Sequence, residues 1–114
     1  MAFVTEKHLD GAKYSYLLSS NIKKYTLRDT TFATRPDGNY EFSRLIEEVP
    51  NSGEGFLMRI IIKSDLSGFK LSITDKSGLR NVNIFKNPNS VFAEKFYFQM
   101  QLFVDREIFT EKEA

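Results

Sequence analysis

Glycine and proline divide this sequence into two parts with different folding potential. All six glycines lie before residue 79, and neither glycine nor proline follows Pro88. Turn sequences such as Pro36-Asp37-Gly38-Asn39 and Asp75-Lys76-Ser77-Gly78 recur between short apolar runs. Glycine adopts positive φ at little cost, and Asp or Asn stabilises a turn locally. The first 87 residues are therefore expected to form short strands joined by hairpins.

Within these pieces, apolar residues recur with the period of a β-strand. Phe69, Leu71 and Ile73 alternate with polar residues, and Tyr40 and Phe42 share one side of a similar segment. This alternation is typical of strands that are buried on one face. The sequence pattern leaves the secondary structure of residues 21–29 ambiguous. Strands are predicted at residues 3–8, 13–18, 30–35, 40–47, 56–63, 69–74 and 79–85.

The segment from Phe56 to Ile62 differs from the other predicted strands. It is apolar on both alternating faces except at Arg59. A strand covered on both sides by other elements has this pattern. We therefore place this segment in the middle of a sheet.

The residues after Asn87-Pro88 predict a helix. Asn is a good N-cap, proline is tolerated at the first helical position, and no helix breaker follows. A helix of roughly 18 to 21 residues is therefore expected near the C-terminus. With the preceding strands, it predicts an α+β fold in which an antiparallel sheet system wraps one long C-terminal helix.

The predicted helix carries two apolar stripes, at about 100° of rotation per residue. Packing on one sheet requires a single stripe, so the second predicts another covering surface, from this chain or from a partner. The first stripe comprises Phe92, Phe96, Met100 and Phe103, with Ala93 and Val104 beside it. The second stripe comprises Val91, Phe98 and Leu102.

Composition limits the class of protein. A chain of 114 residues with 41% hydrophobic and 27% charged residues is expected to form a single domain over residues 1–114. Sixteen basic residues face 15 acidic ones, which disfavours a dedicated nucleic-acid binder. No apolar run is longer than four residues, so neither a membrane span nor a signal peptide is expected.

The chain contains no cysteine. This excludes a disulfide scaffold, a thiolate zinc site, an iron–sulfur cluster and a cysteine nucleophile. It also fits a reducing compartment, and a cytoplasmic location is expected.

The densest polar cluster comprises Lys23, Lys24, Tyr25, Arg28 and Asp29. Cations beside an aromatic ring can hold a phosphate, a carboxylate or an acidic protein surface. A solvated connection with a local Arg28–Asp29 pair explains the same pattern. If the cluster is a site, its binding residues are Lys24, Tyr25, Arg28 and Asp29.

The single histidine, His8, lies near the end of the first predicted strand. A lone histidine acts as a general base only beside a positioned partner, so a surface role is expected. No metal-ligand spacing and no phosphate-binding glycine loop occurs in the sequence. The sequence therefore predicts no metal, no cofactor and no catalytic residue.

Four ordered segments resemble a small bacterial family of domains of unknown function. These segments are Lys23–Thr30, Asp65–Lys70, Val82–Lys86 and Met100–Arg106. The resemblance implies two mostly antiparallel β-sheets packed against a single helix, an arrangement that would supply a covering for each helix stripe. It also implies remote fold similarity to prokaryotic S-adenosylmethionine decarboxylases, and genes that often lie beside those for cysteine desulfurase and methionine salvage.

The similarity to decarboxylases does not carry over their activity. Those enzymes form a pyruvoyl group at a Glu-Ser pair and use a cysteine and a histidine, whereas this chain has no Glu-Ser pair, no cysteine and only His8. The favoured hypothesis is a non-catalytic accessory or interaction domain of sulfur and amino-acid metabolism, with cysteine desulfurase as a possible partner. The alternative is a domain or enzyme that binds an anion or amino-acid derivative.

Overall fold

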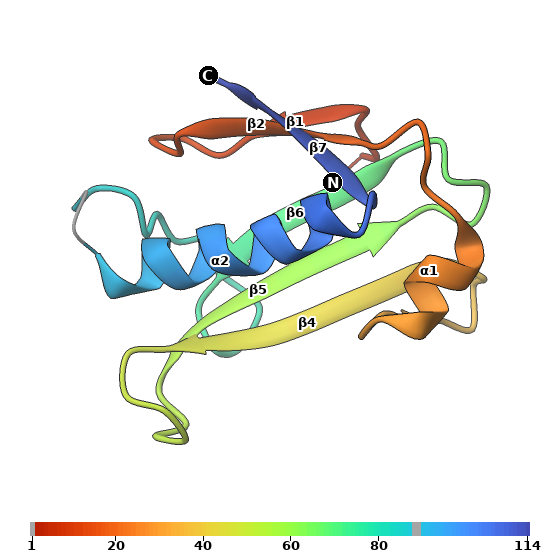
Figure 1. The fold of residues 1–114 in the computed structure, drawn as a ribbon. Helices are drawn as coiled ribbons and strands as arrows, with labels where there is room; N and C mark the ends of the chain where they lie inside the picture. Colours follow the sequence, from red (N-terminus) through yellow and green to blue (C-terminus); the bar gives the residue numbers. More distant parts are fainter. Residues whose placement is uncertain (1, 88–89) are drawn as a thin grey trace.

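Two antiparallel sheets and a C-terminal helix build the fold (Figure 1), which confirms the α+β prediction. The computed structural model describes residues 2–87 and 90–114. The elements are β1 (Glu6–His8), β2 (Tyr14–Leu18), α1 (Lys24–Asp29), β3 (Ala33–Thr34), β4 (Tyr40–Glu47), β5 (Gly55–Ile62), β6 (Phe69–Thr74), α2 (Val91–Asp105) and β7 (Phe109–Glu113).

The larger sheet has the strand order β3-β4-β5-β6, so β5 lies inside it as predicted. Met58, Ile60 and Ile62 of β5 are buried, whereas Leu57 and Ile61 on the opposite face are only partly buried. The expected cover on both faces of this strand is therefore present on one face only. The alternation predicted for β6 is confirmed, because Phe69, Leu71 and Ile73 are all buried.

The smaller sheet has the order β1-β2-β7 and contains a strand that the sequence analysis missed. The chain leaves α2 after Asp105 and passes through Glu107, which adopts a left-handed conformation with a φ of 60°. Ile108 and Phe109 are then buried, with 0% and 1% of their surface exposed. Because a non-glycine residue makes the reversal, the glycine rule for helix ends gave no signal here.

Helix α2 is shorter than predicted and begins later. It has 15 residues, and its N-cap is Ser90, whose hydroxyl accepts a hydrogen bond from the Ala93 N–H. The predicted cap at Asn87-Pro88 is therefore wrong, and Pro88 lies outside the described residues. Among the described residues, no helix has the length and apolar character needed to cross a membrane.

Three predicted strands differ from the structure, and the residues that the sequence left ambiguous form a helix. The ambiguous residues 21–29 contain the short helix α1, which the fully buried Leu27 anchors. Residues 79–85 form a loop whose only described strand-like contact is an isolated bridge between Asn81 and Thr74. The strands predicted at 30–35 and 3–8 shrink to β3 and β1, and Val4 pairs separately with Phe69.

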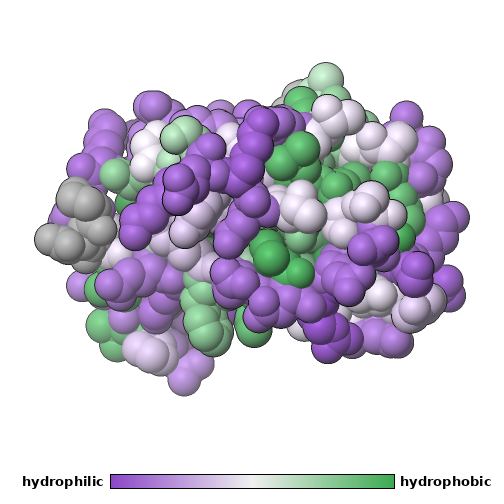
Figure 2. Space-filling view, turned by 45° about the horizontal axis from the view of Figure 1, so that its top comes forward, coloured by the Kyte–Doolittle hydropathy of each residue, from purple (hydrophilic) through white to green (hydrophobic). Residues whose placement is uncertain are grey.

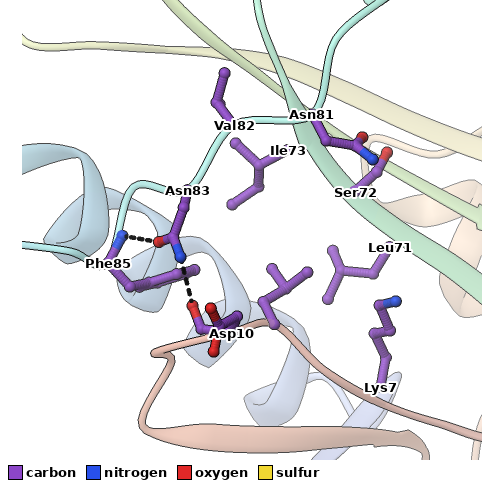
Figure 3. Close-up of a pocket in the computed structure, with 10 residues that line it drawn as sticks. Lys7, Asp10, Leu71, Ser72, Ile73, Asn81, Val82, Asn83 and Phe85 are labelled. Carbon is purple, nitrogen blue, oxygen red and sulfur yellow. Dashed lines mark hydrogen bonds between the residues drawn. The ribbon is translucent and has the colours of Figure 1, made fainter.

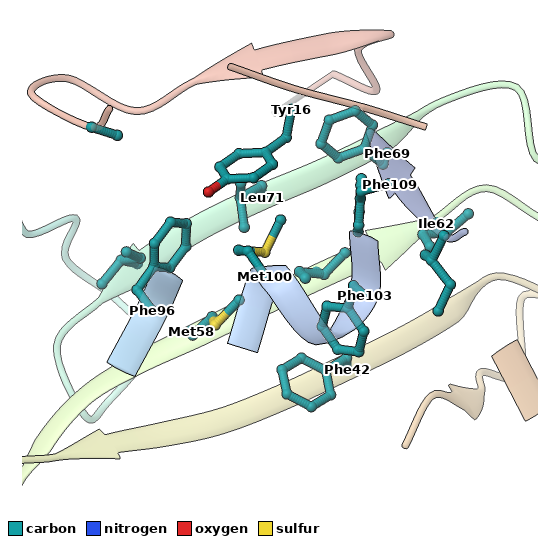
Figure 4. Close-up of a cluster of buried hydrophobic side chains, with 14 of the residues drawn as sticks. Tyr16, Phe42, Met58, Ile62, Phe69, Leu71, Phe96, Met100, Phe103 and Phe109 are labelled. Atoms are coloured by element: carbon teal, nitrogen blue, oxygen red, sulfur yellow. The ribbon is translucent and has the colours of Figure 1, made fainter. Parts of the chain in front are cut away.

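Helix α2 packs between the two sheets (Figures 1 and 4). Its Phe96 ring lies 6.0 Å from the Tyr16 ring of β2, measured between centroids. Its Phe103 ring lies 5.0 Å from the Phe42 ring of β4 and 6.4 Å from the Phe109 ring of β7. The first predicted stripe therefore forms the centre of the core.

The second predicted stripe is not covered by either sheet. Phe98 and Leu102 are 65% and 43% exposed, and Val91 is also exposed. Phe98 lies about 200° around the helix from Phe96, so both sheets contact one wide face and leave the opposite side free. The expectation that the two-sheet arrangement covers both stripes is therefore wrong.

Gln99 lies on the boundary of the wide face. Although its side chain is polar, the residue is only 8% exposed. The Arg44 guanidinium of β4 donates a hydrogen bond to its Oε1 at 2.6 Å. This bond satisfies the amide oxygen where α2 meets the larger sheet.

Candidate functional site

The predicted polar cluster lies on α1. Lys24 and Arg28 lie four positions apart and therefore share one face of this helix. Both are exposed, as are Asp29 and Tyr25, the last at 59%. Among the described residues, no ion pair involves Arg28 or Asp29, so the expected local pair is not formed. Whether these four residues bind an anion stays a prediction.

The double substitution Lys24→Ala with Arg28→Ala is expected to leave the melting temperature nearly unchanged. Exposed charges of this kind contribute only about 0 to 1 kcal/mol. Thermal unfolding followed by circular dichroism measures the effect. A fall of many degrees would show that the two cations support the fold, whereas loss of phosphate or acidic-peptide binding with an unchanged melt would assign them to a site.

His8 supports the turn between β1 and β2. Its Nε2 lies 2.8 Å from the carbonyl oxygen of Ala12, so this ring nitrogen carries the proton and donates the bond. The residue is exposed, in agreement with the expected surface role. Within the described residues, no group of three or more His, Asp or Glu side chains is arranged to hold a metal ion.

Tyr16 is a buried titratable residue of the core. Its hydroxyl has no hydrogen-bond partner among the described residues. Burial, and secondarily the Glu111 carboxylate, raise the pKa of this phenol well above its ordinary value. The side chain therefore stays neutral over the physiological pH range and serves packing against Phe96.

A pocket of about 150 Å³ lies between β6, the turn after β1 and the loop 81–85 (Figure 3). Leu71, Ile73, Val82 and Phe85 supply apolar walls. Lys7 and Asp10 bring opposite charges to the same pocket, from the middle of β1 and the turn that follows it. A hydrophobic pocket with a few convergent polar groups is the usual form of a small-molecule site.

Asn83 fixes the two loops that frame this pocket. Its side-chain nitrogen donates to the Asp10 carbonyl oxygen at 3.1 Å, and its side-chain oxygen accepts from the Phe85 N–H at 2.8 Å. The turn at Gly11 requires a φ of 85°, and a Cβ there would lie 3.1 Å from the Phe85 Cβ. The pocket is thus built by contacts between segments more than 70 residues apart in the chain.

Sequence reasoning did not find this pocket. Lys7 lies inside the predicted strand at 3–8, and Asp10 precedes a glycine as many ordinary turn residues do. Asn81 and Asn83 alternate with apolar residues, which favoured a strand at 79–85 and concealed their position on a pocket wall. The sequence carried no signal that joins these segments, because their proximity depends on the tertiary fold.

The second candidate site is the exposed stripe of Val91, Phe98 and Leu102, which we term the outer face of α2. Phe98 borders a surface hollow together with Arg44 and Lys95. Leu102 borders a neighbouring hollow with Arg106. On the face that Figure 2 presents, apolar residues lie in separate groups among hydrophilic ones. The outer face of α2 therefore combines clustered apolar side chains with a charged border.

These features define a small α+β domain with a pocket beside a sheet edge and an exposed apolar helix face. The family model for DUF1831, whose description reads "putative amino acid metabolism", matches residues 1–110. The chain belongs to this family, as the four resembling segments predicted.

A solved structure supports the same assignment. The chain is similar to a DUF1831 family protein from Lactobacillus plantarum, with 32% sequence identity and a TM-score of 0.88. The match covers 98% of this chain and 99% of that chain. A search of curated proteins found no match. The comparisons thus give a family and a broad metabolic area.

Proposed function

We propose that the domain is a non-catalytic interaction module of amino-acid metabolism that acts in the cytoplasm. The observation that carries this proposal is the outer face of α2, where Phe98 is 65% exposed on the side of the helix opposite the core. Clustered exposed apolar side chains with a polar border are typical of protein-binding surfaces. Aromatic residues also contribute strongly to such interfaces.

The size of this face favours a transient complex over a permanent dimer. A fully buried aromatic side chain contributes about 150 to 250 Å², whereas a standard interface covers about 800 Å² on each partner. Val91, Phe98 and Leu102 can therefore form only the apolar centre of an interface. Lys95, Glu94 and Arg106 would provide its charged border.

The partner that we propose is a cysteine desulfurase. This choice of partner rests on the gene neighbourhood implied by the resemblance of this chain to its family. The description of the family model, amino-acid metabolism, is compatible with it. The complementary surface on the enzyme would present an apolar patch to Phe98 and Leu102. The module would act by contact with this enzyme, without contributing a group to its chemistry.

The test is binding of the purified chain to a cysteine desulfurase from the same cell, measured by titration calorimetry. The double substitution Phe98→Ala with Leu102→Ala is expected to weaken binding at least about tenfold, since each removes an apolar contact of the interface. Its melting temperature should stay close to that of the native chain, because both side chains are exposed.

Leu79→Ala provides the matched control, because Leu79 is 90% exposed and lies outside α2. This variant should bind the enzyme like the native chain. If the native chain does not bind at tens of micromolar concentration, the proposed partner is wrong. If the control and the double variant lose binding equally, the outer face of α2 is not the docking surface.

A further inference from the structure

Along the outer edge of β6, the backbone hydrogen bonding is interrupted at the pocket described above. Phe69 exchanges two backbone hydrogen bonds with Val4, both at 2.9 Å. Four residues further on, the Ile73 carbonyl oxygen accepts from the Val82 N–H at 3.1 Å. In an antiparallel strand, alternate residues direct their N–H and C=O groups to the same edge. Leu71, midway between these two contacts, therefore directs both groups to the gap.

The backbone groups in this gap have no backbone partner among the described residues. They are the N–H and C=O of Leu71 and the N–H of Ile73. Leu71 is 1% exposed and Ile73 is 4% exposed, so bulk water does not solvate these groups freely. Buried backbone polar groups are almost always hydrogen-bonded. The gap therefore calls for a molecule that both accepts and donates hydrogen bonds.

The pattern at Leu71 matches a single amino-acid residue. In a hydrogen-bonded antiparallel pair, two facing residues exchange both N–H···O bonds, so one residue satisfies the N–H and the C=O of its partner. The contacts at Phe69 and Ile73 close the gap at both ends. Four residues of strand span only about 13 Å, which excludes a long added strand.

The pocket also carries the charges that a free amino acid requires. Lys7 and Asp10 line it, and among the described residues neither side chain forms a hydrogen bond or an ion pair. Figure 3 shows the nitrogen end of Lys7 directed towards Leu71. A cavity of about 150 Å³ suits a ligand of roughly the size of benzene, and is too small for a nucleotide.

We propose that this pocket binds a free α-amino acid with an apolar side chain. The Leu71 N–H and the Lys7 ammonium group hold the carboxylate of the ligand. The Leu71 carbonyl oxygen and the Asp10 carboxylate hold its ammonium group, and Val82 and Phe85 contact its side chain. This inference is independent of the outer face of α2, because it rests on a different surface of the domain.

Titration of the isotope-labelled full chain with L-leucine, L-methionine and L-alanine tests the proposal by NMR. At least one of them should shift the amide resonances of Leu71 and Ile73, with saturation below about 10 mM. For that amino acid, the N-acetyl and amide derivatives should bind at least about tenfold more weakly, since each removes one charge. Absence of binding by all three, or equal binding of the derivatives, would overturn the proposal.

Two substitutions test the charged groups directly. Lys7→Met and Asp10→Asn preserve side-chain size and should each weaken binding about tenfold or more while the melting temperature is retained. Lys76→Met is the matched control, because Lys76 is exposed in a turn outside the pocket and should leave binding unchanged. Native affinity in both pocket variants would contradict the assigned roles. The Phe98→Ala and Leu102→Ala variant should bind the amino acid normally, which separates this result from the partner proposal.

Discussion

A chain that ends at Asn87 is expected to lose cooperative folding. The deletion removes α2 and β7, including Phe96, Met100 and Ile108, each of which is 0% exposed. Loss of one buried phenylalanine side chain costs about 3 to 5 kcal/mol, and a whole domain is stable by about 5 to 15 kcal/mol. Removal of several such side chains therefore exceeds the stability of the domain.

The strand pairing leads to the same expectation. In the strand order β1-β2-β7, loss of β7 leaves β1 and β2 as an isolated hairpin. Two-stranded hairpins are marginally stable in water. Thermal unfolding followed by circular dichroism should show a broad, non-cooperative change for the truncated chain. A sharp melting transition would contradict the central position assigned to α2.

The long strands were predictable because apolar and polar side chains alternate along them. Phe69, Leu71 and Ile73 alternate with polar residues, and the larger sheet buries that face. The loop 79–85 shows the limit of this rule. Its residues alternate in the same way, yet only Asn81 forms a bridge, while Phe85 packs on Phe96 of α2. Local alternation therefore does not distinguish a strand from a loop that packs on a helix.

The ends of α2 were less predictable because they depend on local geometry. Ser90 supplies the N-cap, although Asn is also a good capping residue and Asn87 lies just upstream. At the other end, Glu107 adopts a φ of 60°, and the chain reverses so that Phe109 reaches the core. Burial of Ile108 and Phe109 favours this reversal over further turns of helix.

The two candidate sites depend on tertiary contacts to different extents. The sequence showed the stripe of Val91, Phe98 and Leu102, because packing on one sheet requires only one apolar stripe and this is the second. Only the structure shows that both sheets contact the opposite side of the helix. The pocket gave no sequence signal, because Lys7 and Leu71 are brought together by the packing of the two sheets.

Phe96→Ala is expected to destabilise the domain by about 3 to 5 kcal/mol. Phe96 is fully buried, and its ring contacts those of Tyr16 and Phe85 at centroid distances of 6.0 and 5.4 Å. Removal of the ring leaves a cavity between α2 and the smaller sheet, and the surrounding aromatic rings cannot fill it fully. Met100→Ala, at a second fully buried position, is expected to cost about 2 to 5 kcal/mol.

The matched control is Phe98→Ala, which makes the same chemical change two residues away in the same helix. Phe98 is 65% exposed, so this substitution is expected to change the free energy of unfolding by only about 0.5 kcal/mol or less. Glu94→Ala and Gln101→Ala, at exposed positions, should behave in the same way. Urea unfolding measures all five variants under one condition. Equal losses of unfolding free energy at Phe96 and Phe98 would mean that the buried face of α2 is assigned wrongly. A large difference between them would locate the core of the domain on the side of the helix that contacts both sheets.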